Sequence, residues 1–347
     1  MLLSQIAASA GGVLYTDGEF NGVAVDSRKI REGNLFVCFR GARVDGHDFI
    51  SQAVSAGAAA ALCERRLDAD IPQLVVDSSV LALQQFAADY RRSLDVKITA
   101  VTGSVGKTST KEFIYAVLSR RFPTHKTYGN MNSETGLPIT LLGIKPSDRA
   151  AVVELGMSAL GEIKALSDIA NPDVAVITNI GFSHIESLGS QQNILRAKLE
   201  IIDGLKKDGV LILNADDPFL RQAKDALYGS RQILTFGIDS PDCDVRAESV
   251  RCADGGQDFI LHFPGNTLRA KILCEGRHNV YNALAAAAVG FCYGLDARTI
   301  CDGLLDFRNA PMRQDCYDRD GCYIIEDCYN ASPASVRAAA DILSRRS

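Results

Sequence analysis

The residues with the clearest chemistry lie in the range 96–122, which reads VKITAVTGSVGKTSTKEFIYAVLSRRF. Gly103 and Gly106 bracket a short turn there, and Lys107 and Thr108 complete it. Because glycine permits unusual φ angles and close approach, backbone N–H groups of such a turn can converge on an anion at the positive end of the next helix. The lysine can reach the outer phosphates of a nucleotide, and the threonine hydroxyl can hold a magnesium ion. The spacing therefore predicts a phosphate-binding loop.

A strand and a helix must flank this turn if it is to bind phosphate. β-branched residues predominate in 96–101, which predicts the strand, and apolar residues recur with helical spacing in 113–118, which predicts the helix. The spacing G-x-x-G-K-T is two residues shorter than the general pattern G-x-x-x-x-G-K-[ST]. A chance glycine turn before a helix is the alternative, and the strand and helix in register argue against it.

The composition is that of an ordinary globular protein. The chain has 347 residues, 47% of them hydrophobic and 23% charged, which allows about two or three domains with ample core. A net charge of -5 and a pI near 5.6 give no general attraction to nucleic acid or to anionic membranes. Any anion must therefore be bound by a local site.

Neither secretion nor a metal-bound cysteine cluster is indicated. The first residues lack the basic start of a signal peptide, and the longest uncharged stretch is too short to span a bilayer, so we expect a cytoplasmic protein. Ten cysteines are scattered without a C-x-x-C pair, which argues against a zinc site or a disulfide framework. We interpret them as reduced thiols.

The order of predicted elements divides the chain into three parts. Residues 1–94 read as a small α/β domain. Residues 95–310 alternate strands and helices, which is typical of a doubly wound, mostly parallel sheet whose ligands gather at the carboxyl ends of its strands. Residues 311–347 supply one strand (322–327) and one helix, either docked on the middle domain or beginning a truncated third domain. The further strands predicted in the middle domain are 150–155, 173–180, 209–213 and 232–236.

Polar side chains follow neighbouring strands of this predicted sheet. Glu154 ends the strand AVVEL, and a carboxylate there is costly unless it is paired, for example with a magnesium ion that also binds nucleotide phosphates. A turn carboxylate is the alternative. Asn179 and His184 follow the next strand, and a lone histidine is more often a hydrogen-bonded loop residue than a ligand. Because Thr108, Glu154 and His184 lie at the same edge of one sheet, we treat all three as candidate metal ligands.

Lys198 is the most informative residue outside the loop. In the predicted helix NILRAKLEIIDGL, it lies between Ile194 and Ile201 on an apolar face. Burial disfavours an ammonium ion, so the pKa should fall and the neutral amine should become nucleophilic. Such an amine can take up carbon dioxide to form a carbamate, which behaves as a further carboxylate ligand for a second metal ion. A lysine whose ammonium reaches the surface is the alternative.

Two further segments of the middle domain could present polar groups to a ligand. The loop NMNSETGLP (130–138) carries amides and hydroxyls before an apolar helix, although chance polarity would also explain it. The segment GRHNVYNALAAAAVG opens an alanine-rich helix. Its Asn279 could cap that helix or form a hydrogen bond with a nucleobase.

The first domain contains a possible anion site. Arg28, Arg40 and Arg43 lie in loops around a predicted strand, with Ser27 beside Arg28. A pocket for a diphosphate or a carboxylate needs donors of this kind. A solvated surface is the alternative.

Taken together, these segments resemble the Mur ligases of peptidoglycan synthesis. The resemblance extends from Asp26 to the end of the chain, and the loops favour the member that adds D-alanyl-D-alanine to UDP-N-acetylmuramoyl-tripeptide over the one that adds the third amino acid. The matching segments, in order, are TGSVGKTST, NMNSETGLP, ELGMSALGEI, TNIGFSHIESLG, AKLEI, GRHNVYNALAA and EDCYNASP.

The resemblance assigns roles residue by residue. It implies that Lys107 neutralises the γ-phosphate of ATP, that Thr108 and Glu154 hold magnesium, that His184 serves a second metal ion and that Lys198 is carbamylated. The implied ATP contacts are Gly103, Ser104, Val105, Gly106, Lys107, Thr108, Ser109, Asn279, Arg313 and Asp327. The residues similar to those that line the path of the UDP-sugar peptide are Ser27, Arg28, Asn132 and Ser133.

The implied activity is that of an ATP-dependent ligase working through an acyl phosphate. Gln314 and Ser332 depart from the family pattern, and the family continues for about another domain, Rossmann-like in fold, after the point at which this chain stops. We therefore expect this chain to bind ATP yet to ligate poorly by itself, as a monomer with neither nucleic acid nor membrane as partner. The alternatives are a nucleotide-binding regulatory module or non-catalytic fragment, another Mur ligase, and folylpolyglutamate synthase.

Overall fold

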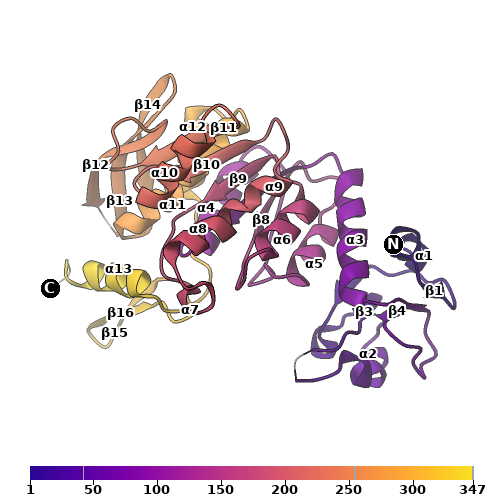
Figure 1. The fold of residues 1–347 in the computed structure, drawn as a ribbon. Coiled ribbons are helices and arrows are strands. Elements are labelled where there is room, and N and C mark those ends of the chain that lie inside the picture. Colours follow the sequence, from indigo (N-terminus) through magenta and orange to yellow (C-terminus); the bar gives the residue numbers. More distant parts are fainter. Residues whose placement is uncertain (42, 254, 346–347) are drawn as a thin grey trace. The chain divides into compact units, whose positions relative to one another are not determined.

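The computed structural model describes residues 1–41, 43–253 and 255–345 (Figure 1). The chain divides into two compact units. Unit 1 contains Met1–Asp95 and Thr127–Pro146, and unit 2 contains Val96–Lys126 and Ser147–Ser347. Within the described residues, no helix is long and apolar enough to cross a membrane.

Unit 1 is built on a five-stranded sheet. Strands β2 to β5 are parallel, and β1 pairs antiparallel with β5. Helix α5 (Gly136–Leu142) begins within the segment 130–138 and packs on α3 (Ser79–Ser93). Tyr90 Oη of α3 donates a hydrogen bond to the carbonyl of Ile144, just after α5 (2.6 Å). In sheet order the strands are β1 (Val13–Leu14), β5 (Gln73–Val75), β4 (Ala60–Cys63), β3 (Asn34–Val37) and β2 (Gly22–Ala24). The helices are α1 (Leu3–Ala10), η1 (Ser27–Lys29), η2 (Gly46–Phe49), α2 (Ile50–Ser55), α3 (Ser79–Ser93) and α5 (Gly136–Leu142).

Unit 2 is built on a nine-stranded sheet whose larger part is parallel, as predicted. The strands from β7 to β12 in sheet order pair in parallel, and β13 and β14 extend the sheet as antiparallel neighbours. In sheet order the strands are β14 (Asn266–Ile272), β13 (Gly256–Phe263), β12 (Val245–Ala253), β11 (Gln232–Gly237), β10 (Val210–Asn214), β9 (Val174–Ile177), β6 (Lys97–Thr102), β8 (Ala150–Glu154) and β7 (Thr124–Lys126).

Helices cover both faces of this sheet, which is the doubly wound arrangement that the sequence predicts (Figure 1). Because side chains alternate along a strand, Val152 of β8 packs into the core that α4 and α11 share, while Val153 is buried on the other side. One set of helices comprises α4 (Lys107–Ser119), α11 (Arg277–Cys292) and α12 (Ala297–Leu305). The other comprises α6 (Glu162–Ala170), α7 (Ile185–Leu188), α8 (Gln191–Leu199), α9 (Ile201–Gly204) and α10 (Pro218–Leu227).

The single helix predicted over 193–205 is wrong, because two helices occupy this range. Helix α8 ends at Leu199 and α9 begins at Ile201. The residue between them, Glu200, turns its carboxylate to the start of α6, where it accepts hydrogen bonds from the backbone N–H groups of Gly161 (2.8 Å) and Lys164 (3.2 Å). A carboxylate at a helix N-terminus is favoured by the helix dipole. The interruption between α8 and α9 thus coincides with a contact between Glu200 and a helix distant in sequence.

The last segment forms a hairpin and a helix. The strand predicted at 322–327 is β16 (Cys322–Glu326), and it pairs antiparallel with β15 (Asp315–Arg319), which sequence analysis did not identify. The predicted helix is α13 (Pro333–Leu343), with Ser332 as its N-cap and Pro333 in its first turn.

Candidate nucleotide site

The phosphate loop joins β6 to α4, and its two glycines are required by its path. Gly103 has φ +148°, and a Cβ atom there would lie 1.9 Å from Thr178 Oγ1. Gly106 has φ +82°, and a Cβ atom there would lie 2.8 Å from Asn282 Oδ1. Any larger residue would clash with these neighbours and would also strain the backbone. The predicted strand, loop and helix are therefore all present.

Residues after β9 hold the tip of the loop. The side chain of Asn179 binds both sides of the Val105 residue: Oδ1 accepts from its N–H (3.0 Å) and Nδ2 donates to its carbonyl (3.0 Å). Thr178 Oγ1 donates to the same carbonyl (2.7 Å). Sequence reasoning noted Asn179 without a role and missed Thr178. Their position directly after a buried strand, at the ligand edge of a parallel sheet, was the available signal.

The first turn of α4 can receive an anion. Within the described residues, no side chain caps this helix, so its first N–H groups stay open to a ligand. Lys107 Nζ folds back and donates to the carbonyl of Gly103 (2.9 Å). Burial lowers the pKa of Lys107, Glu154 opposes that effect, and the positive charge of Arg313 reinforces it.

Thr108 and Glu154, the two predicted ligands of one metal ion, lie beside the loop and contact each other. Thr108 Oγ1 donates to Glu154 Oε2 (3.0 Å). Glu154 is the last residue of β8 and is only 3% exposed. Among the described residues, no group of three or more histidine, cysteine, aspartate and glutamate side chains could hold a metal ion.

Two basic residues lie near the same edge. Lys198 of α8 is 1% exposed, which rules out the surface alternative, and its pKa lies well below the usual value because of burial and the charge of Lys107. His184 has φ +67°, an uncommon conformation for a residue other than glycine. Partial burial and the charges of Lys198 and Lys107 lower the pKa of His184. Lys107 and Arg313 act on each other in the same region, and their positive charges suit a polyanion such as a triphosphate.

Asn279 does not cap α11, so the capping alternative is wrong. Gly276 occupies the N-cap position, and no side chain of the described chain caps the helix. Asn279 is instead buried, and its Nδ2 donates to the carbonyl of Glu275 (2.8 Å) and to Gln314 Oε1 (2.8 Å). Gln314, at which the sequence departs from the family pattern, therefore accepts a hydrogen bond from Asn279, a predicted ATP contact.

Two other predicted ATP contacts lie in the last segment. Arg313 stacks over the ring of Tyr329, with its guanidinium carbon 4.3 Å from the ring centre. Asp327 follows β16, and its negative charge acts on His278 in the first turn of α11. Arg313 also acts electrostatically on Lys107, so these residues belong to the same charged region of unit 2.

The predicted substrate residues lie in unit 1. Ser27 is buried and donates to Gln52 Oε1 (2.9 Å). The Arg28 side chain is 79% exposed and forms two hydrogen bonds with Asp26, each 2.9 Å long. Asn132 and Ser133 lie in the loop before α5, where Ser133 Oγ accepts from the N–H of Gly136 (3.3 Å).

Comparison with known families agrees with the predicted architecture. Residues 101–290 match the Mur ligase middle domain, and residues 19–91 match the Mur ligase family catalytic domain. The chain is 43% identical to the UDP-N-acetylmuramoyl-tripeptide--D-alanyl-D-alanine ligase of Bacillus subtilis, over 98% of this chain and 74% of that protein. It is 36% identical to the enzyme of the same name from Escherichia coli, over 99% of this chain and 76% of that protein.

Solved structures give the same result. MurF from Acinetobacter baumannii superposes with a TM-score of 0.91 at 36% identity, covering 99% of this chain and 76% of that one. MurF from Thermotoga maritima, solved in complex with ADP, has a TM-score of 0.83 at 31% identity, covering 94% and 75%. With the sequence relatives above, these likenesses confirm the resemblance inferred from the motifs. The chain belongs to the Mur ligase family.

Proposed function

We propose that this chain is an ATP-dependent ligase that joins D-alanyl-D-alanine to UDP-N-acetylmuramoyl-tripeptide in peptidoglycan synthesis. The names of its relatives support the two substrates. The observation that carries the proposal is the meeting of Lys107, Thr108 and Glu154 at one edge of the unit 2 sheet. This donor set suits a nucleoside triphosphate.

The chain's own residues would bind ATP through its phosphates. The open N–H groups at the start of α4 would bind phosphate oxygens, and Lys107 would exchange its bond to Gly103 for one to the γ-phosphate. Asn279, Arg313 and Asp327 would contact the remainder of the nucleotide. The ADP-bound structure of the Thermotoga relative supports nucleotide binding.

Magnesium fits the oxygen donors present. Thr108 and Glu154 would hold one ion, and His184 and a modified Lys198 would serve a second. Magnesium prefers oxygen ligands and usually keeps water and phosphate among them, so a large protein cluster is not needed. When bound, the ions would neutralise charge that develops on the transferred phosphoryl group.

A carbamate on Lys198 fits the surroundings of that side chain. Within the described part of the chain, no carboxylate forms an ion pair with Lys198, and the residue is buried. Its lowered pKa increases the fraction of neutral amine that can react with carbon dioxide. The modification would place an anion beside Lys107.

The reaction would proceed in two transfers. The terminal carboxylate of the tripeptide attacks the γ-phosphate of ATP, giving an acyl phosphate and ADP. The amine of D-alanyl-D-alanine then attacks the activated carbonyl, and phosphate leaves. Holding the reactants in line is most of the catalysis.

Ser27, Arg28, Asn132 and Ser133 would contact the UDP-linked substrate in unit 1. Use of ATP also favours a cytoplasmic location.

Phosphate release tests this function. We expect release only when ATP, UDP-N-acetylmuramoyl-tripeptide and D-alanyl-D-alanine are all present, with Lys107→Met as the inactive control. A chain that binds ADP, but whose phosphate release does not depend on either co-substrate, would contradict the ligase assignment. A folate in place of the UDP-linked substrate serves as the negative substrate.

The carbamate has a test of its own. Protein equilibrated with 13C-bicarbonate should give a carbamate carbon resonance in its NMR spectrum, and Lys198→Gln should remove it. Lys111→Gln is a matched control, because Lys111 is also about 1% exposed but is paired with Glu112 (3.1 Å). A resonance that persists in Lys198→Gln would place the modification elsewhere.

A further inference from the structure

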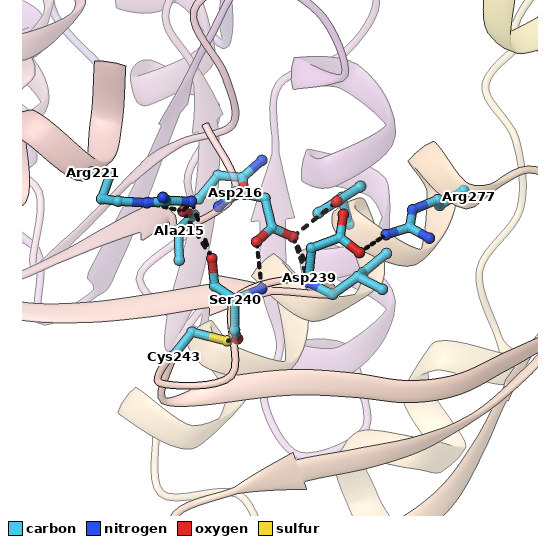
Figure 2. Close-up of polar contacts among 10 residues, drawn as sticks. Ala215, Asp216, Arg221, Asp239, Ser240, Cys243 and Arg277 are labelled. Carbon is cyan, nitrogen blue, oxygen red and sulfur yellow. Dashed lines mark hydrogen bonds and ion pairs between the residues drawn. The ribbon is translucent and has the colours of Figure 1, made fainter. Parts of the chain in front are cut away.

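The loop after β10 contains a carboxylate that is bound by four donors. Asp216 accepts hydrogen bonds from the backbone N–H groups of Ile238 (2.6 Å), Asp239 (2.9 Å) and Ser240 (2.8 Å). Figure 2 shows this carboxylate facing the turn that carries Asp239 and Ser240. The hydroxyl of Tyr281 is the fourth donor, at 2.9 Å. The side chain thus joins two elements that are distant in sequence.

The fourth donor belongs to α11 rather than to the turn. Tyr281 lies in the second turn of this helix. Arg277, the first residue of the helix, forms an ion pair with Asp239 of the same turn (Figure 2). Its guanidinium carbon also lies 6.0 Å from the centre of the Tyr281 ring. The start of α11 is therefore tied to the loop between β11 and β12 directly through Arg277, and by way of Asp216 through Tyr281.

The same turns of α11 contact the phosphate loop. Thr110 Oγ1 of α4 donates to Asn282 Oδ1 (3.0 Å). That oxygen lies only 2.8 Å from the place where a Cβ atom of Gly106 would be. Because the loop passes so close to Asn282, a displacement of the first turns of α11 would change the path open to the loop. It would also break the bond to Thr110.

We propose that Asp216 is a positioning residue for the nucleotide, which acts through Tyr281 to hold the start of α11 against the phosphate loop. This inference rests on the proposed ATP-binding function and extends it to a side chain in the loop after β10. The nucleotide itself would contact the phosphate loop and Asn279. Asp216 would fix the position of α11, and therefore the position of Asn279 relative to the loop.

The chemistry of the site requires a carboxylate. Four donors converge on Asp216, and an anion with two oxygens can accept all of them. Asparagine would turn an amide N–H₂ group toward other N–H donors and leave at least one of them unsatisfied. Burial raises the pKa of Tyr281, so its hydroxyl stays protonated and remains a donor at neutral pH.

The sharpest variant is Tyr281→Phe, which removes one hydroxyl and leaves the three backbone bonds of Asp216 in place. Tyr293→Phe is the matched control. Its hydroxyl donates to the carbonyl of Lys97 (3.1 Å) and lies 3.0 Å from Thr99 Oγ1, at the opposite end of the same helix. Both tyrosines are partly buried, so the two changes should cost similar stability. Only the first breaks the link to Asp216.

The experiment measures the Kd for a fluorescent ADP analogue, together with the Tm, for wild type, both phenylalanine variants, Asp216→Asn and the double variant. A hydrogen bond to a charged group is strong enough that Tyr281→Phe should raise Kd by about five- to tenfold. Tyr293→Phe should change Kd by less than about twofold, with a similar fall in Tm. Asp216→Asn with Tyr281→Phe should bind no more weakly than Asp216→Asn alone.

The outcomes separate the two proposals. Wild type that does not bind the analogue overturns the ATP-binding function, and this inference with it. Wild type that binds, with Tyr281→Phe equal to Tyr293→Phe in Kd, overturns the positioning role alone and leaves Asp216 as a cap of its turn. If Asp216→Asn does not fold, the Kd values of Tyr281→Phe and Tyr293→Phe still decide whether the positioning role holds.

Discussion

Asn179 holds the phosphate loop in place without belonging to it. Its amide group binds both the N–H and the carbonyl of Val105, so it fixes the orientation of that residue between the two glycines. A loop that is already ordered binds its anion without losing further conformational freedom. Under the proposed function, this asparagine would reduce the entropy lost when a nucleotide binds.

Replacement of Asn179 by alanine should weaken ADP binding by about tenfold, because two hydrogen bonds that order Val105 are lost together. Asn179→Asp should be similarly impaired, since a carboxylate cannot donate to the carbonyl. Isothermal titration with ADP would measure both. Asn34→Ala is the control, because Asn34 makes comparable amide contacts in unit 1, with Asn21 and Arg31. Equal affinities in all three variants would contradict this function.

Asp216 should give the protein an acid-sensitive component of stability. Burial raises the pKa of this carboxyl, but the bonds from Asp239, Ser240, Ile238 and Tyr281 outweigh that effect and bring it to about 2. The unfolded-state pKa is about 3.9, so the stabilisation is fully present above about pH 4 and is lost as the pH falls toward 2.

After allowance for solvent screening, this effect should amount to about 1–2 kcal/mol of unfolding free energy. Urea unfolding of unit 2 at a series of pH values would measure it. Asp216→Asn should be less stable at neutral pH, and the difference from wild type should shrink between about pH 4 and 2. A difference that stays constant over that range would show that the carboxyl does not titrate as expected.

At the level of elements, α12 packs on α4 at a distance that only glycine allows. A Cβ atom on Gly303 would lie 2.5 Å from the Cα atom of Val117, and backbone atoms cannot move aside as a flexible side chain can. Nearby, the rings of Phe113 and Phe307 stack in parallel, with 3.5 Å between their centres. The two helices and the segment after α12 are thus in close contact at both places.

This packing predicts a reversal of the usual effect of alanine in a helix. Alanine normally stabilises a helix interior by about 0.5–1 kcal/mol relative to glycine. Gly303→Ala should instead destabilise unit 2 by about 1–3 kcal/mol, because the added methyl group overpacks the contact with α4. Asp302→Ala, on the exposed side of the same helix, should be close to neutral. Urea midpoints compare the two, and a stabilising Gly303→Ala would show that the helices separate easily.

For the whole molecule, residue spacing and periodicity predicted the features that depend on residues close together in the sequence. The phosphate loop, the parallel strands and the burial of Lys198 follow from spacing and periodicity, and the structure has all three. Strands β12 to β15 were missed although each pairs with a strand next to it in the sequence. Few residues of β12, β14 and β15 are buried, so these strands carry little of the apolar alternation that marks a strand. The break at Glu200 and the position of Gln314 beside Asn279 depend on long-range contacts that periodicity does not contain.

The two units should respond to nucleotide separately. Two groups of buried apolar side chains each draw on one unit only, one around α4 and α11 and the other around β3 and β4. The proposed ATP contacts all belong to unit 2. A ligand that binds only the folded state stabilises it by about 2.7 kcal/mol at a hundred times Kd, so ADP should protect unit 2 alone. Hydrogen exchange read by mass spectrometry should show slower exchange in 103–119 and 277–292, with α3 of unit 1 unchanged. Lys107→Met should abolish the protection, and equal protection of α3 would show that the two units unfold together.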